Sequence, residues 1–311
     1  MDDAAGQSWM RRHLEAPVLP LLDAPWILDV DVTVKPLYGH QEGAVLGYNP
    51  HKPGRPSHAY HSYMMAGLRL ALDLAVEPGN ETHAKYGRPQ LAQVLDRLPA
   101  GKRPRLVRGD CGYGADAVMR DLETRSQSYL FKLRLTKNVR RYIEKVFFGD
   151  DWRDAGQGWE GRDGEITLSG WQQARRVVLL RRPLKGDVML ADDSQQVLAF
   201  VESQVPAQRY EYAVLVTDLP YELLSIAQLY RDRGDAENPF DELKNQWGWG
   251  GYTTHDLKRC RIAAMGVGLI YNWWSLFVRL ANPQARLEAI TSRPLLLCAV
   301  GRRIEHAGHQ Q

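Results

Sequence analysis

Several kinds of segment are missing from this sequence of 311 residues. It contains no run of about eighteen apolar residues, and therefore no conventional membrane-spanning helix. Near its beginning, Arg11 and Arg12 are followed by His13, not by the apolar core of a secretory signal. Internal repeats and low-complexity tracts are absent as well. We therefore expect a folded protein of the cytoplasm that does not interact with membranes.

Cysteine is scarce, and the few residues of this type are widely spaced. Cys111, Cys260 and Cys298 fit neither a disulfide framework nor a zinc motif, so we expect three free thiols. His58 and His61 are three residues apart and would make half of a metal site, but the sequence places no third soft ligand near them. A histidine-based metal site is therefore not expected.

The net charge of +3 is small, but the positive charge is concentrated in one region. Residues 101–145 contain twelve Lys and Arg against five Asp and Glu, a local excess of seven positive charges. Such a patch suits a polyphosphate partner, and binding of that kind weakens as salt rises. Charge alone fits a solvated basic surface equally well.

The first half of the chain alternates between strand and helix patterns. Strands are predicted at 26–34, 105–108 and 129–135, and helices at 90–98 and 116–125. The apolar stretch 63–76 fits either one helix or two strands around Gly67. This order predicts a mixed α/β fold.

The second half changes character at about residue 150. Short apolar segments separated by Gly, Pro, Asp and Ser predict an antiparallel β region with strands at 165–168, 176–180, 197–201 and 212–217. Helices are predicted at 223–247 and 257–280. Trp273 and Trp274, in the second of these helices, are expected to be core or packing residues and not ligands.

Isolated acids accompany two of the predicted strands. The period of two along a strand places Asp29, Asp31 and Thr33 on one face. Two acids on one face are costly unless they are paired or bind a metal. Asp110 follows the strand at 105–108 and precedes a glycine-rich turn. Carboxylates that converge from rigid elements suit metal-dependent phosphoryl transfer, although either Asp alone could also end a strand or cap a helix.

A third acid lies within the helix predicted at 223–247. Tyr230, Arg233, Glu237 and Lys244 have offsets of 0, 3, 7 and 14 residues. On one continuous helix they fall within a sector of roughly 60°. One helical face would then carry a hydroxyl, a guanidinium, a carboxylate and an ammonium. Taken alone, the same spacing is equally typical of an ordinary ion-paired helix.

Together these segments resemble the DDE transposases of bacterial insertion sequences. Residues 230–244 match the signature Tyr-x2-Arg-x3-Glu-x6-Lys of that superfamily without a gap. Asp31-Val32-Thr33 is similar to its Asp-x-Thr strand motif, and Arg108-Gly109-Asp110-Cys111-Gly112-Tyr113 to its Arg-Gly-Asp-x-Gly-Phe/Tyr motif. Residues 39–43 and 52–57 also resemble sequences of this superfamily. The resemblance covers about residues 26–282.

The resemblance implies an RNase H-like fold, a mixed five-stranded sheet flanked by helices. An antiparallel β insertion would lie between the second and third catalytic acids, and a helical segment would follow the third. The implied division of the chain is a residual N-terminal segment (1–25), the first part of the core (26–149), the β-rich insertion (150–220), the last part of the core with the signature helix (221–282) and a C-terminal tail (283–311).

The resemblance also implies a function and a site. Asp31, Asp110 and Glu237 would hold two Mg²⁺ ions, with Mn²⁺ as a substitute, for DNA strand cleavage and strand transfer. Tyr230, Arg233 and Lys244 would contact DNA. The implied partners are the terminal inverted repeats of the element and its target, both double-stranded DNA, and a second copy of the chain in a homodimer on DNA.

Several alternatives stay open at this stage. Asp29 competes with Asp31 as the first acid, whereas Glu242 is about 140° around the helix from Glu237 and is a poor substitute for it. Pro239 is expected to kink the helix or to start a new one capped by Asn238.

Only about thirty residues precede Asp31, and this leaves other functions open. Family members usually have a larger N-terminal region that recognises the terminal repeats. The chain could therefore be a truncated relic, or an inhibitor that dimerises with a full-length transposase through its C-terminal helices. A stand-alone nuclease with the same triad is a third possibility. Trp247 and Trp249 could stack on an unpaired base or pack in the core.

Overall fold

One large mixed sheet organises the fold. The computed structural model describes residues 3–23, 25–49, 52–184, 210–252, 254–298, 305–306 and 309–310. The strands of the sheet are β1 (Ile27–Pro36), β2 (Ser57–Met65), β3 (Leu70–Pro78), β4 (Leu106–Gly109), β5 (Tyr129–Lys132), β6 (Arg153–Gly156), β7 (Trp159–Ile166), β8 (Arg175–Pro183) and β9 (Tyr210–Thr217). They are ordered β3-β2-β1-β4-β5-β9-β8-β7-β6. A separate pair, β10 (Glu305–His306) and β11 (His309–Gln310), lies near the C-terminus.

The first five strands combine antiparallel and parallel pairing. β1 and β2 are antiparallel, as are β2 and β3, whereas β4 is parallel to both β1 and β5. The ambiguous stretch 63–76 therefore forms parts of two strands, and its helical interpretation is wrong. The turn between them has positive φ angles at Gly67 (75°) and Arg69 (53°), a conformation that glycine adopts without steric cost.

The expected count of five strands is wrong, because nine strands form this sheet in the described part of the chain. The edge of β5 pairs with β9, as in Phe131 opposite Val216, and β8, β7 and β6 continue the sheet by antiparallel pairing. Segments 165–168, 176–180 and 212–217 overlap β7, β8 and β9. The strand predicted at 197–201 lies outside the described residues.

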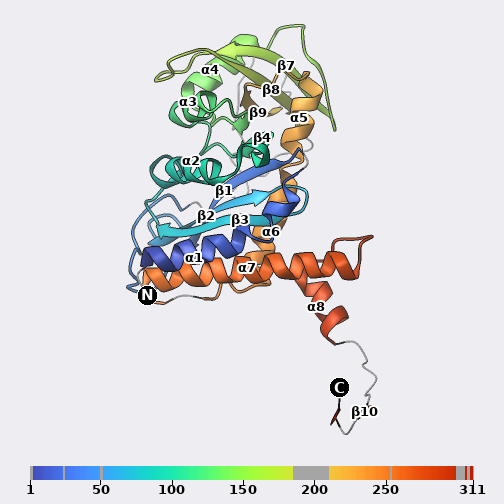
Figure 1. The fold of residues 1–311 in the computed structure, drawn as a ribbon. Helices are drawn as coiled ribbons and strands as arrows, with labels where there is room; N and C mark the ends of the chain where they lie inside the picture. Colours follow the sequence, from blue (N-terminus) through green and yellow to red (C-terminus); the bar gives the residue numbers. More distant parts are fainter. Residues whose placement is uncertain are drawn as a thin grey trace.

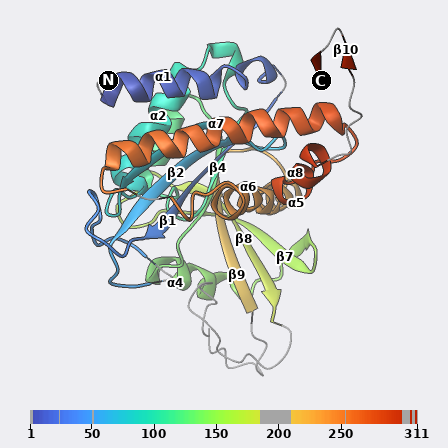
Figure 2. The ribbon, with the colours of Figure 1, turned by 90° about the horizontal axis from the view of Figure 1, so that it is seen from below.

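Helices cover both faces of the sheet (Figures 1 and 2). They are α1 (Asp3–Glu15), α2 (Arg88–Arg97), α3 (Asp116–Thr124), α4 (Lys137–Val146), α5 (Leu223–Arg231), α6 (Gly234–Asn245), α7 (Leu257–Ala281) and α8 (Ala289–Leu297). Short turns are η1 (Leu19–Leu21), η2 (His83–Gly87) and η3 (Ala100–Lys102). None of the described helices is both long and apolar enough to cross a membrane.

The two faces bury different apolar clusters. Leu28 and Val30 of β1 point to the face that α2, α3 and α4 cover. α1, α6 and α7 share a second cluster with β2 and β3, and α5 packs with β4, β5, β8 and β9 in a third. Since side chains alternate along β1, Asp29 and Asp31 point away from the α2–α3–α4 face.

The helix predicted at 223–247 is broken. α5 ends at Arg231, and α6 begins at Gly234 after a turn at Asp232 and Arg233. The weak helix propensity of glycine helps the chain to change direction there. The argument from a single continuous helix is therefore wrong. Pro239 lies inside α6, so the restart expected at Asn238 is also wrong.

The C-terminal region contains more structure than a tail. Buried Glu242 of α6 accepts hydrogen bonds from the N–H of Ala289 (3.0 Å) and from Arg286 (2.5 Å), which fastens α8 to α6. In α7, Trp273 is 55% exposed and is therefore not a core residue, whereas Trp274 is half-buried. Trp249 is buried in the core, and Trp247 is half-buried.

Candidate active site

Two of the predicted acids come together where the parallel pairing of β1 with β4 ends. Val30 of β1 is in register with Gly109 of β4, and the next residues along the chain are Asp31 and Asp110. Burial, the largest effect, and the negative charge of Asp110 together raise the pKa of Asp31 to about 6, against the opposing effect of Arg233. Two carboxylates therefore repel one another between two inner strands of the sheet.

Each of these carboxylates is held by one oxygen. Oδ1 of Asp31 accepts a hydrogen bond from the N–H of Val32 (2.8 Å) and lies 3.5 Å from the guanidinium of Arg233. Oδ1 of Asp110 accepts from the N–H of Gly112 (2.9 Å) and lies 3.4 Å from Nε2 of His83. Within the described part of the chain, the Oδ2 atoms of Asp31 and Asp110 make no hydrogen bond or ion pair. The side chains of Asp31 and Asp110 are 24% and 34% exposed.

Asp29 has a different environment although it lies on the same strand face. Its two carboxylate oxygens accept hydrogen bonds from Nε (2.7 Å) and Nη2 (2.8 Å) of Arg108. The two side chains are only 4% and 3% exposed, and Arg108 also donates to the carbonyl of Leu229. This closed ion pair occupies Asp29, so of the two competing acids Asp31 is the better candidate for binding a cation.

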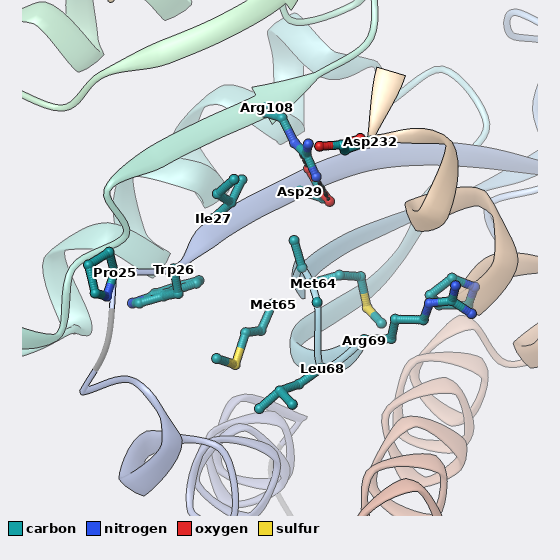
Figure 3. Close-up of a pocket in the computed structure, with 13 residues that line it drawn as sticks. Pro25, Trp26, Ile27, Asp29, Met64, Met65, Leu68, Arg69, Arg108 and Asp232 are labelled. Carbon is teal, nitrogen blue, oxygen red and sulfur yellow. Dashed lines mark hydrogen bonds and ion pairs between the residues drawn. The ribbon is translucent and has the colours of Figure 1, made fainter. Parts of the chain in front are cut away.

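A cavity of about 430 Å³ lies beside this closed pair (Figure 3). Its wall is largely apolar, with Trp26, Met64 and Met65 among the lining residues, and Asp29 and Arg108 form a polar part of it. The cavity lies between the start of β1, the β2–β3 turn and the α5–α6 connection. Neither Asp31 nor Asp110 lines it. The cavity and the acid pair are therefore separate features.

Three residues of the predicted signature, Tyr230, Arg233 and Lys244, interact with the acid pair. Burial disfavours the charged form of Arg233, but Asp31, Tyr230, Asp110 and Asp29 together outweigh this effect and raise the pKa of its guanidinium. Burial raises the pKa of Tyr230, and both Asp31 and Asp110 add to this effect. Burial lowers the pKa of Lys244, while Asp31 opposes the shift. The break between α5 and α6, not a common helical face, allows these side chains to converge.

Glu237 belongs to the first turns of α6, between Arg233 and Lys244 in the sequence. Its side chain lies outside the described part of the structure. Its role as the third acid stays a prediction.

His83 is a site residue that sequence analysis missed. It begins η2, 27 residues before Asp110, and no motif in the sequence connects the two positions. By contrast, His58 and His61 are buried, and their Nε2 atoms bond to the carbonyls of Glu42 (2.8 Å) and Glu81 (2.9 Å). Burial lowers the pKa of both, that of His61 to about 4.

The acid pair fits a hard divalent cation. Among the described residues, no three of His, Cys, Asp and Glu gather as a complete metal-binding group. Asp31 and Asp110 nevertheless offer two oxygens that make no described contact, and their mutual repulsion would be relieved by a positive charge between them. Mg²⁺ prefers oxygen ligands and is commonly held by one or two carboxylates. The donor set is thus chemically suitable.

The basic region 101–145 separates into paired and unpaired cations. Of the six cations before residue 126, four form ion pairs: Lys102 with Asp23, Arg108 with Asp29, Arg120 with Asp116, and Arg125 with Asp96. In contrast, no described carboxylate lies within 4.0 Å of five later, exposed cations, which we term the α4 cationic surface: Arg134, Lys137, Arg140, Arg141 and Lys145.

The α4 cationic surface begins close to the acid pair. Arg134 interacts with Cys111, the residue that follows Asp110. On α4 itself, Val139 and Ile143 are buried against the core, so the cations occupy the opposite, solvent-facing side. Figure 1 shows α4 at the opposite end of the molecule from α1 and α7. A run of unpaired positive charge therefore extends away from the two acids.

Comparisons with known proteins identify the family of this chain. Residues 23–273 match a family model described as "Transposase DDE domain". Among solved structures, the chain is similar to the piggyBac transposase in a cryo-EM structure of its synaptic complex with hairpin DNA, at 13% identity and a TM-score of 0.45. The match covers 92% of this chain and 57% of that one. No curated protein matches the chain.

Proposed function

We propose a function from the premise that this chain belongs to the transposase DDE domain family. In this proposal the chain is the transposase of an insertion sequence, which cleaves DNA at the ends of the element and transfers the cut strands to target DNA. One observation carries the proposal: Asp31 and Asp110 meet where the pairing of β1 with β4 ends, each held through Oδ1 and each with an Oδ2 that makes no described contact.

The proposed ligands of the metal are Asp31, Asp110 and Glu237. Two Mg²⁺ ions, or Mn²⁺ in their place, would supply positive charge to the attacking and leaving oxygens of the phosphodiester. The α5–α6 turn would keep Glu237 close to the two strand acids. The contribution of the protein is to position these oxygens, since charge neutralisation and orientation supply most of the rate in phosphoryl transfer.

The signature residues would bind the DNA strand beside the acids. Arg233 stays charged next to Asp31 and can donate to a phosphate oxygen close to the cleaved bond. Tyr230 keeps its proton, because burial raises its pKa, and can therefore donate a hydrogen bond. Lys244 adds a second cation on the same side. The α4 cationic surface would follow the phosphate backbone farther from the site, in double-stranded DNA of the terminal repeats or the target.

The strand order supports an RNase H-like core. In β3-β2-β1-β4-β5, the chain makes two antiparallel hairpins and then two parallel crossovers, which places the acids of β1 and β4 side by side. We therefore propose 26–149 and 221–282 as the two parts of that core. β6 to β9 would be its insertion, within 150–220, preceded by the segment 1–25 and followed by 283–311.

An inhibitor is a second candidate function. Ile270, Trp273, Phe277 and Leu280 recur at helical spacing on α7, and all four are exposed. Exposed apolar residues that follow one helical face favour association with another chain. Such a face would serve either a homodimer on DNA or the pairing of a non-mobilising copy with a full-length transposase.

Cleavage of labelled DNA duplexes that cover the flanks of the gene tests the proposed function. With Mg²⁺ present, we expect wild-type protein to nick a strand at one defined position, and Asp110→Asn to bind the same duplex without nicking it. Binding without any nicking, together with inhibition of a full-length transposase, would favour the inhibitor. A protein that neither binds nor nicks these duplexes would contradict both candidates.

A further inference from the structure

The connection between β3 and α2 presents His83 to the acid pair. It forms η2, a single π-helical turn in which the N–H of Gly87 reaches back to the carbonyl of Thr82 at 3.2 Å. Turns of this kind are rare and occur frequently at functional sites. Here the turn places the start of η2, including the His83 ring, next to the end of β4.

The His83 ring fits closely against the loop that contains Asp110. A Cβ atom at Gly112 would lie 2.4 Å from ring atoms of His83, so any other residue at Gly112 would displace the ring. Tyr113 is edge-on to the ring, with 4.9 Å between the centroids and an interplanar angle of 87°. Packing thus determines which edge of the imidazole faces Asp110.

The polar edge of the ring points to an oxygen that already accepts a hydrogen bond. Nε2 of His83 is buried, lies 3.4 Å from Oδ1 of Asp110, and has no hydrogen-bond partner in the described structure. A buried polar atom without a partner is unfavourable. A small reorientation of the ring, together with a shortening of this distance to about 3.0 Å, would complete a hydrogen bond to that oxygen.

We propose that His83 is a positioning residue for the metal ligand Asp110. Nε2–H of His83 and the N–H of Gly112 together hold Oδ1, which leaves Oδ2 of Asp110 directed to the cation. This inference rests on the proposed function, because it assumes that Asp110 binds a divalent ion. Hydrogen bonds that orient a metal ligand typically change metal affinity by about 10–100-fold.

Binding of Mn²⁺ to the full chain without DNA, measured by isothermal titration calorimetry, tests the proposal without relying on cleavage. His83→Ala should weaken Mn²⁺ binding by about tenfold or more. His83→Gln retains an N–H donor at a similar distance from the backbone and should recover most of the wild-type affinity. His58→Ala is the control: it removes a buried histidine that bonds to the carbonyl of Glu42 and not to an acid, and should lower the melting temperature without changing Mn²⁺ affinity.

The outcomes separate this inference from the proposed function. Wild-type affinity in His83→Ala would overturn the positioning role but leave metal-dependent cleavage intact. Equal losses in His83→Ala and His83→Gln would also overturn it, because the hydrogen bond would then not be the cause. If the wild-type chain itself binds no Mn²⁺, the metal site of the proposed function fails together with the role of His83.

Discussion

Asp29 and Asp31 are two residues apart on the same face of β1, yet they lie in opposite kinds of environment. The Asp29 region is closed: both carboxylate oxygens are bonded to Arg108, and water is almost excluded. The Asp31 region is open: one oxygen is held, the side chain is 24% exposed, and the nearest acid, Asp110, has the same charge. The first arrangement is complete in itself, whereas in the second two acids share the positive charge of Arg233.

This difference indicates how one strand combines stability with chemistry. A buried acid with a paired arginine costs little once both are in place, but either one alone is expensive. An acid close to another acid destabilises the fold unless a cation joins them. The same contrast separates the paired cations before residue 126 from the unpaired α4 cationic surface. Charges that the fold leaves unpaired are thus the candidates for binding a ligand.

The largest expected effect is on cleavage. Asp31→Ala and Asp110→Ala should each lower the Mg²⁺-dependent nicking rate by at least about a thousandfold, because each removes a ligand that neutralises charge in the transition state. Single-turnover nicking of a labelled duplex measures this. Both variants should retain wild-type circular dichroism. A rate within about tenfold of wild type would remove that residue from the site.

The next effect concerns the closed pair. Arg108→Met should destabilise the fold by about 3–5 kcal/mol, since Asp29 would be left buried and charged. Urea unfolding gives the change in free energy. The double variant Asp29→Asn/Arg108→Met should recover a large part of the loss, because it removes both charges. If Arg108→Met alone lowers the free energy of unfolding by less than about 1 kcal/mol, Asp29 does not depend on a buried ion pair with Arg108.

A smaller effect is expected on DNA affinity. Neutralising Lys137, Arg141 and Lys145 together should weaken duplex binding and reduce the slope of log K against log salt by about 3, if each contacts one phosphate. Fluorescence anisotropy at several salt concentrations measures both. The control neutralises exposed Arg12, Lys258 and Arg259, which lie on α1 and α7. Equal slopes of log K against log salt in the two triple variants would contradict DNA binding by the α4 cationic surface.

The smallest effect has the opposite sign. Asp31→Asn should stabilise the metal-free protein by about 1 kcal/mol, because it removes one of two neighbouring negative charges. Thermal unfolding in the presence of a chelator detects the gain. Asp29→Asn provides the contrast and should destabilise, since Arg108 loses its charged partner. A loss of stability in Asp31→Asn would contradict this balance, because the ion pair with Arg233 would then outweigh burial and the repulsion by Asp110.

The sequence alone predicted the strands that position the acids more reliably than the geometry around them. The apolar patterns that lead to Asp31 and Asp110 are local, and both β1 and β4 follow from them. The extent of the sheet is not local, because pairing of β5 with β9 joins residues about 85 positions apart, as Phe131 and Val216 illustrate. No periodicity within either segment indicates which edge it will join.

The same distinction explains the errors around the signature. The spacing of Tyr230, Arg233 and Lys244 predicts one continuous helix. The chain instead turns at Asp232 and Arg233, and this break brings the three side chains to the acids. The contact of His83 with Asp110 depends on the path of a loop and on the missing side chain of Gly112, neither of which leaves a spacing pattern. Side-chain convergence from separate loops is a tertiary property.

The most direct test of the open acid pair is a crystal structure of the full chain grown with Mn²⁺, with anomalous diffraction used to locate the ion. We expect a Mn²⁺ peak in contact with Oδ2 of both Asp31 and Asp110, and no peak at Asp29. The same map from Asp110→Asn crystals should lose the peak. A peak absent from Asp31 and Asp110, or bound to Asp29 in place of Arg108, would contradict the assignment of the open pair as the metal site.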